Sequence, residues 1–210
     1  MNLKKLVTAA VCTMLMAAVA FTAGCGGEKK SDKKVLKVGM ECAYAPYNWS
    51  QTKADGGAVK IAGSNEYAYG YDVMMAKKLA DSMGADLEIH KIEWDGLAPA
   101  VVSGKIDAAI AGMSITSKRK ETVDFTKPYY YATVVALVKK DSEQAKAQSV
   151  ADLKGSVATS QLNTIWYDQI DQVPDVKKLP AIDTVPGMIV ALTSGKCNLI
   201  VTDILSLIHI

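Results

Sequence analysis

A hydroxyl-rich segment with one arginine is the part of the chain best suited to hold a small anion. Residues 112–119 read GMSITSKR and follow an apolar run. Thr116 or Ser117 is a candidate N-cap, so a helix is expected to begin there with unpaired backbone N–H groups. Arg119 in its first turn adds a guanidinium that can bind a carboxylate through two hydrogen bonds. The segment favours a carboxylate ligand, and the alternative is that Arg119 pairs with a surface acid such as Glu121.

Sequence motifs of the common enzyme classes are missing. There is no G-x-S-x-G, P-loop, H-E-x-x-H or glycine-rich dinucleotide motif. His90 is the only histidine before His209, and it falls in an expected strand with no Cys or carboxylate at metal-ligand spacing. A surface histidine is therefore expected there, not a catalytic base. The sequence argues against most enzyme classes and predicts no catalytic residue, metal site or cofactor.

Composition describes a globular chain. Half of its 210 residues are apolar, and 24 Lys and Arg stand against 22 Asp and Glu. Removing the first 24 residues takes away Lys4 and Lys5 and no acid, which leaves 22 charges of each sign. A net charge of zero gives no electrostatic reason to expect nucleic acid. The length allows one large core or two small ones.

The first 24 residues have the pattern of a secretory signal peptide. Lys4 and Lys5 precede the uncharged stretch 6–21, and small residues then lead to Cys25. An apolar stretch of about 16 residues is near the lower limit for spanning a bilayer, so a cleaved signal is favoured over a permanent anchor.

Cys25 is the candidate attachment point for a lipid. The small residues before it resemble a bacterial lipobox, which would make Cys25 the lipidated first residue of the mature protein. The charged residues 25–34 would then be a solvated tether. Thr22 stands where that motif usually has Leu, so cleavage without lipidation is the alternative. The expected location is extracytoplasmic, lipid-anchored to the cell membrane or periplasmic.

Two other cysteines, Cys42 and Cys197, remain after the signal is removed together with Cys12. Their separation matches no metal or redox spacing. Buried thiols are the expectation, and a disulfide between them is the alternative.

Strand and helix patterns alternate through the first half of the mature chain. Strands are expected at 35–40, 87–90 and 108–111, helices at 72–83 and 97–103, and a loop rich in Gly, Asn and Ser at 48–66. Asp72 is the candidate N-cap of the first helix, while Gly84 and Gly104 end the two helices. Such alternation predicts βαβ units, a parallel sheet and an α/β fold class.

A weak internal repeat indicates a second lobe of the same plan. Residues 101–110 are echoed by residues 192–201: in both, a helix ends at Gly, a Lys follows and an apolar strand comes next. The apolar, β-branched segment 133–138 is expected to cross between the lobes. The expected domains are lobe 1 at 35–133 and lobe 2 at 134–204.

Seven short stretches resemble the extracytoplasmic solute-binding proteins of polar amino acid ABC transporters, bacterial family 3. They are 43–47 (AYAPY), 70–73 (GYDV), 94–100 (WDGLAPA), 103–108 (SGKIDA), 113–116 (MSIT) with Arg119, 124–130 (DFTKPYY) and 152–155 (DLKG). The resemblance runs in family order from about residue 35 to residue 203. It implies a periplasmic-binding-protein-like type II fold, in which two α/β lobes joined by a strand hinge close on an amino acid.

The resemblance also implies a role and partners. A monomer on a lipid tether would deliver an amino acid to an ABC permease in the membrane, without catalysis or a cofactor. Two other classes share the fold, namely dehydratases acting on cyclohexadienyl acids such as arogenate, and sensory ligand-binding domains of receptors. A dehydratase needs a general acid or base, which Glu41 or Asp203 would have to supply.

In lobe 1 the resemblance assigns the ligand's α-carboxylate to Arg119, with Ser114 and Gly112 assisting. In lobe 2 it assigns the ligand's α-ammonium group to Asp203, which ends the repeated strand. Asn163 and Thr164 match positions that offer donors to the ligand. This turn departs from the family pattern, because Leu162 stands where relatives have Gly.

Two aromatic residues and an acid match the positions around the ligand's side chain. Tyr44 and Trp94 would lie above and below it, and Glu41 at the far end of the pocket. Aromatic faces around a desolvated cation contribute roughly 0.5 to 2 kcal/mol each, and a buried acid needs a partner. We therefore expect arginine or lysine, with glutamine as the neutral competitor. The alternative is that Glu41 pairs with Lys53 or Lys60 in a long loop.

Family members continue well beyond the point that corresponds to Asp203. Residues 205–210, LSLIHI, can be back-translated as CTG TCT CTT ATA CAC ATC, the end of a transposase adapter used in library preparation. We expect these six residues to be an assembly artefact and the fold to be C-terminally truncated.

Overall fold

A computed structural model describes residues 34–207 of the chain, with side chains described up to residue 205. The signal peptide and Cys25 lie outside the described residues, so their assignment stays a prediction. Within the part described, no helix combines the length and the apolar character needed to cross a membrane.

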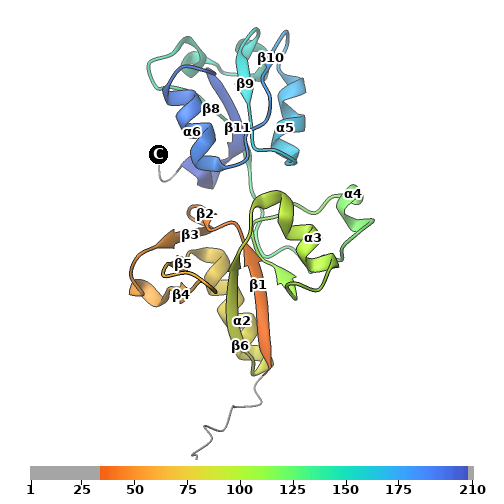
Figure 1. Cartoon of the computed structure of the whole chain (residues 1–210). Helices are drawn as coiled ribbons and strands as arrows, with labels where there is room; N and C mark the ends of the chain where they lie inside the picture. Colours follow the sequence, from red (N-terminus) through yellow and green to blue (C-terminus); the bar gives the residue numbers. More distant parts are fainter. Residues whose placement is uncertain (1–33, 208–210) are drawn as a thin grey trace, which may run out of the picture. The chain divides into compact units, whose positions relative to one another are not determined.

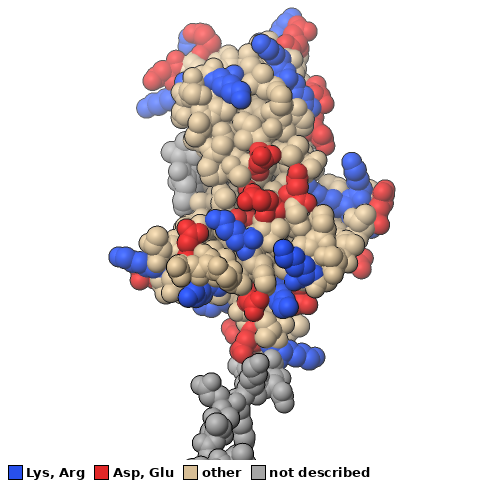
Figure 2. All heavy atoms as spheres, in the orientation of Figure 1, with Lys and Arg blue, Asp and Glu red and all other residues tan. Residues whose placement is uncertain are grey.

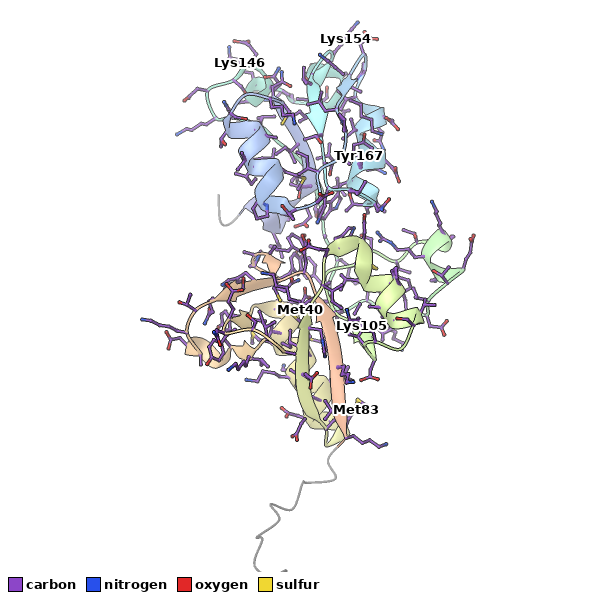
Figure 3. All side chains as sticks on the ribbon, in the orientation of Figure 1. Met40, Met83, Lys105, Lys146, Lys154 and Tyr167 are labelled. Atoms are coloured by element: carbon purple, nitrogen blue, oxygen red, sulfur yellow. The ribbon has the colours of Figure 1, made fainter. Side chains whose placement is uncertain are left out.

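Lobe 1 is built on a parallel sheet of order β6-β1-β7 (Figure 1). Its strands are β1 (Val35–Met40), β6 (Asp86–Lys91) and β7 (Ala108–Ala109). The crossovers contain α2 (Tyr71–Met83) and α3 (Leu97–Val102), which pack on β6 and on β1 and β7. The predicted βαβ units are confirmed. Figure 3 labels Met40 and Met83, the last residues of β1 and α2, at opposite ends of this sheet.

The expected loop at 48–66 is wrong in part, because residues 48–51 and 59–60 belong to a small antiparallel sheet. This sheet has the order β2-β3-β5-β4, with β2 at Ala43–Tyr44, β3 at Asn48–Gln51, β4 at Val59–Lys60 and β5 at Tyr67–Tyr69; η1 (Asp55–Gly57) lies between β3 and β4. Trp49 faces Tyr69 across the ladder, with ring centroids 5.1 Å apart. Strands of two to four residues are too short to show a period of two, so cross-strand pairing decides them.

Asp72 is not the N-cap of α2. The helix begins one residue earlier, at Tyr71, and its N-cap is Gly70, with φ +126°. The first N–H groups of α2 donate to the carbonyls of Pro46 and Tyr47 at 3.1 and 2.8 Å, so backbone acceptors replace a side-chain cap. A Cβ at Gly70 would lie 2.3 Å from the carbonyl oxygen of Tyr47, which explains the glycine. Gly84 ends α2 in the left-handed conformation, as predicted.

Lobe 2 contains a sheet of order β10-β9-β11-β8. The strands are β8 (Val134–Leu137), β9 (Val157–Thr159), β10 (Lys177–Lys178) and β11 (Leu199–Asp203), and only β8 runs antiparallel to its neighbour. The repeat is confirmed, since α6 (Val185–Thr193) passes through Gly195 into β11 as α3 passes through Gly104 into β7. Strand β8, within the segment 133–138 that was expected to cross between the lobes, pairs with β11 in the lobe 2 sheet.

The remaining helices are short. They are η2 (Trp94–Gly96), α4 (Ser117–Lys120), η3 (Glu143–Lys146), η4 (Val150–Leu153), α5 (Ile165–Gln169), η5 (Ile170–Gln172) and η6 (Ile204–Leu207). On the face drawn in Figure 2, basic side chains are scattered among acidic ones, in keeping with the balanced charge of residues 25–210.

Each lobe has its own hydrophobic core. Val38, Met40 and Ile89 centre the core of lobe 1, while Leu199 and Ile200 of β11 centre that of lobe 2. Cys42 lies in the first core and Cys197 in the second, and both are free, buried thiols. The buried-thiol expectation is confirmed, and the alternative of a disulfide is wrong.

Candidate functional site

The candidate site gathers at the carboxyl ends of the sheet strands, where ligands bind in open α/β sheets. Glu41 follows β1, the segment with Gly112 follows β7, Gln161 follows β9 and Asp203 ends β11. Each of these positions is set by a strand whose apolar residues are anchored in a core, so the polar residue beyond the strand end is held in place.

Glu41 is a buried acid, with only 3% of its surface exposed. Its two carboxylate oxygens accept hydrogen bonds from Nε2 of Gln161 at 3.2 and 3.1 Å, and the same nitrogen donates to the carbonyl of Asp183 at 3.0 Å. Burial raises the pKa of Glu41 to about 7; the bond from Gln161 opposes this shift and the charge of Glu93 adds to it. The partner of Glu41 is thus a neutral amide, not Lys53 or Lys60.

Asp203 and Tyr44 form a second buried polar pair. Tyr44 Oη donates to Oδ2 of Asp203, and the backbone N–H of Leu205 donates to Oδ1 at 2.8 Å. Only 4% of Tyr44 and 1% of Asp203 are exposed. The ring of Tyr44 also stacks on Tyr47 and meets Trp166 edge-on, with centroids 4.7 and 5.9 Å apart.

Arg119 points to backbone carbonyls instead of to Glu121. One guanidinium nitrogen donates to Ser114 O and the other to Asn163 O, both at 2.7 Å. The guanidinium carbon lies 5.5 Å from the centroid of the Trp94 ring, a cation–π contact. Burial lowers the pKa of Arg119, and the charge of Asp168 opposes that shift. Three N–H donors of the guanidinium are left over after these two bonds.

The helix expected after residue 115 exists but is a single turn. Thr116 is its N-cap and accepts a hydrogen bond from the N–H of Arg119 at 3.2 Å, as predicted. Because α4 has four residues, its dipole is small. The suitability of this segment for an anion therefore depends on the guanidinium and the loop, not on the helix end.

The polar side chains of the turn in lobe 2 are hydrogen-bonded to other protein groups. Asn163 has φ +53°, and its Nδ2 donates to Asp95 Oδ1 at 2.9 Å. Thr164 is the N-cap of α5, and its hydroxyl donates to the carbonyl of Gln161 at 2.7 Å. Asn163 takes the left-handed conformation, which Asn tolerates better than most residues.

Gly112 is required by its conformation and its surroundings. Its φ is +62°, and a Cβ would come within 3.2 Å of the Tyr44 ring. Its N–H donates to Tyr129 Oη at 2.9 Å. The loop thus approaches the aromatic ring through a residue without a side chain.

Two adjoining cavities open among these residues. A small one of about 10 Å³ is bounded by Trp94, Arg119, Gln161 and Thr164. A larger one of about 290 Å³ is bounded by aromatic rings, by Asp203 and by aliphatic and small polar residues. The two share the lining residues Tyr44, Gly112, Ser114, Ile165 and Trp166.

Seven of the nine residues predicted for the ligand line one of these cavities. They are Tyr44, Trp94, Gly112, Ser114, Arg119, Thr164 and Asp203. Glu41 and Asn163 lie behind this lining and reach it through Gln161 and Arg119. Gln161 and Trp166 were missed by the sequence reasoning; Gln161 directly precedes the predicted turn, whereas no pattern singles out Trp166.

A family model and curated relatives match this chain. Residues 36–178 match the model of bacterial extracellular solute-binding proteins, family 3. The chain is 30% identical over 197 residues to the ABC transporter arginine-binding protein 1 of Escherichia coli K12, which covers 93% of this chain and 70% of that protein. It spans 41 to 59% of the lengths of three further relatives.

Solved structures agree with this match. An ancestral arginine-binding protein bound to glutamine is 31% identical, with a TM-score of 0.71 over 85% of this chain and 74% of that chain. An ancestral amino acid-binding protein described as a precursor of cyclohexadienyl dehydratase is 32% identical, with a TM-score of 0.68 over 80% of this chain and 70% of that chain. The fold is therefore the type II periplasmic-binding-protein-like fold, and the chain belongs to the bacterial extracellular solute-binding proteins of family 3.

Proposed function

We propose that this protein binds a polar amino acid outside the cytoplasm and delivers it to an ABC permease. Its ligand is cationic, arginine or lysine, with glutamine as the neutral competitor. The relatives named for arginine, and an arginine-binding ancestor bound to glutamine, support this range of ligands.

The buried carboxylate of Glu41 is the observation that carries the cationic assignment. It lies at the end of β1 behind the small cavity, and its partner is the neutral amide of Gln161. A buried ionised carboxylate is stabilised far more by a cation than by an amide. A guanidinium or ammonium group between the rings of Tyr44 and Trp94 would supply that cation and gain cation–π energy as well.

The remaining residues bind the α-carboxylate and the α-ammonium group of the ligand. The unused guanidinium donors of Arg119 bind the α-carboxylate, assisted by Ser114 and Gly112. Asp203 pairs with the α-ammonium group, in place of its bond from Tyr44. Asn163 and Thr164 contribute donors from lobe 2 after small rotations of the turn. These roles agree with the cavity lining of seven of the nine residues.

Delivery requires release and anchoring as well as binding. The lobes 35–133 and 134–204 open and close about the segment that leads into β8, a hinge movement. The signal 1–24 directs secretion, and a lipid on Cys25 with the tether 25–34 holds a monomer at the membrane.

Thermal unfolding against the twenty amino acids is the first test. The protein used in this assay lacks the predicted signal, residues 1–24. A ligand at a hundred times its Kd stabilises by about 2.7 kcal/mol, a shift in Tm of roughly 5 to 10 °C. Shifts with arginine or lysine are expected. A shift with glutamine alone would contradict the pairing of Glu41 with a cationic side chain and would still support amino acid transport.

A dehydratase is the second candidate, because Glu41 has the pKa of a general acid at neutral pH. Its pKa of about 7 lies where proton transfer is most efficient. A precursor of such an enzyme is among the similar structures. Product formation from arogenate that is lost in Glu41→Gln would establish this function, whereas binding of arginine without turnover supports transport. If none of the twenty amino acids raises Tm, this enzyme or a sensory domain is favoured.

A further inference from the structure

A third buried carboxylate, not used in the proposed function, lies behind the site. Asp72 is 0% exposed in the first turn of α2. Its Oδ2 accepts a hydrogen bond from Asn48 Nδ2 and its Oδ1 accepts one from Tyr129 Oη, both at 2.7 Å. Both donors are neutral groups. Burying a carboxylate with neutral partners costs folding free energy, and its replacement would leave the buried donors of Asn48 and Tyr129 without an acceptor.

Tyr129 connects Asp72 to the loop of Gly112. A tyrosine hydroxyl has one proton, and Tyr129 gives it to Asp72. Its oxygen is therefore free to accept the N–H of Gly112, at 2.9 Å. Gly112 lines both cavities of the site. An acceptor at position 72 thus orients the Tyr129 hydroxyl, whose oxygen holds the Gly112 peptide.

Asn48 connects Asp72 to Cys42, the residue after Glu41. Because Asn48 directs its NH₂ group at Asp72, its Oδ1 faces the N–H of Cys42 and accepts it at 2.7 Å. Cys42 has φ +56°, a conformation that costs free energy in a residue with a side chain. The hydrogen bond from Cys42 to Asn48 offsets that cost and sets the peptide that carries Glu41.

We propose that Asp72 is a positioning residue of the ligand site, which as a double acceptor holds the Gly112 peptide through Tyr129 and the Cys42 peptide through Asn48. The first branch orients the loop that meets the ligand's α-groups, and the second orients Glu41 toward the ligand's side chain. The roles of Gly112 and Glu41 toward a ligand rest on the proposed function; the two branches themselves do not.

Amide hydrogen exchange tests the branches without any ligand. In Tyr129→Phe the amide of Gly112 is expected to exchange roughly tenfold faster, with that of Cys42 unchanged. Asn48→Leu should show the reverse. Asp72→Asn, which replaces an acceptor by a donor on one side, should accelerate both amides. Asn198→Leu is the matched control, because Asn198 holds the N–H of Val157 in lobe 2 in the same way, at 2.8 Å.

Calorimetric binding of arginine and of citrulline, its neutral isostere, tests the consequence for the site. Tyr129→Phe should raise both Kd values about three- to tenfold and leave their ratio unchanged. Asn48→Leu should raise the Kd of arginine more than that of citrulline. Asp72→Asn should raise both Kd values and raise that of arginine more than that of citrulline. Its effect on the Kd values should not add to that of Tyr129→Phe in a double-mutant cycle.

A purely structural Asp72 gives a different result. In that case Asp72→Asn would lower Tm as Asn198→Leu does, exchange at Gly112 and Cys42 would rise no more than elsewhere, and both Kd values would stay at those of the unchanged protein. That outcome overturns the proposal. If the unchanged protein binds no amino acid, the proposed function fails, while the exchange rates of the two amides still decide whether Asp72 holds both peptides.

Discussion

Replacing Glu41 by Gln removes a charge whose free-energy cost can be worked from its environment. Burial raises the pKa of Glu41 from 4.5 to about 7. Each pKa unit corresponds to 1.36 kcal/mol, so the ionised form destabilises the ligand-free fold by about 3 kcal/mol. The protonated form carries no such cost. Folding stability from this group is therefore fully present below pH 4.5 and is lost as the pH rises through 7.

A cation in the site reverses this preference, because it needs the ionised form of Glu41. With a pKa of about 7, the carboxylate is about nine-tenths protonated at pH 6 and about nine-tenths ionised at pH 8. The Kd of arginine should therefore fall roughly tenfold from pH 6 to pH 8, with release of a proton on binding near pH 6. Binding of neutral citrulline should not improve over this range.

The assay is titration calorimetry in two buffers of different ionisation enthalpy, together with urea unfolding of the ligand-free protein. Glu41→Gln should weaken arginine binding by well over tenfold, remove its pH dependence and raise the free energy of unfolding at pH 8. The separate pH dependence from Asp72, whose pKa burial raises to about 6, should remain in this variant. An arginine affinity that is unchanged in Glu41→Gln would refute the cationic assignment.

Three further outcomes follow from the site and the cores. Arg119→Lys should raise the Kd of every bound amino acid roughly tenfold to a hundredfold, because an ammonium cannot form the paired hydrogen bonds of a guanidinium; equal affinities in calorimetry would contradict this role. Gly112→Ala should lower the free energy of unfolding by about 1 to 3 kcal/mol, since φ is +62° and the added Cβ meets the Tyr44 ring. Ile200→Ala, at a fully buried position of β11, should cost about 2 to 5 kcal/mol in urea unfolding, and a loss below 1 kcal/mol would show that the lobe 2 core is loosely packed.

Long elements with a clear period were predictable from the sequence. The strand at 35–40, the helix that ends at Gly84 and the paired repeat that ends in β7 and β11 all appear in the structure. The antiparallel sheet at 43–69 was not, since each strand has four residues or fewer and forms only when its partners are brought together. Asp72 was placed at the helix start but in the wrong role, because its partners Asn48 and Tyr129 are remote in sequence.

The α/β class, the family resemblance and the residue types of the candidate site could be read from the sequence alone, because these depend on local periodicity and on motifs in order. Which polar groups are hydrogen-bonded to one another depends on the tertiary structure. Gln161 meets Glu41 across 120 positions, and Tyr44 meets Asp203 across 159. Burial then sets the pKa of Glu41, and burial is a property of packed neighbours that no local stretch of sequence contains.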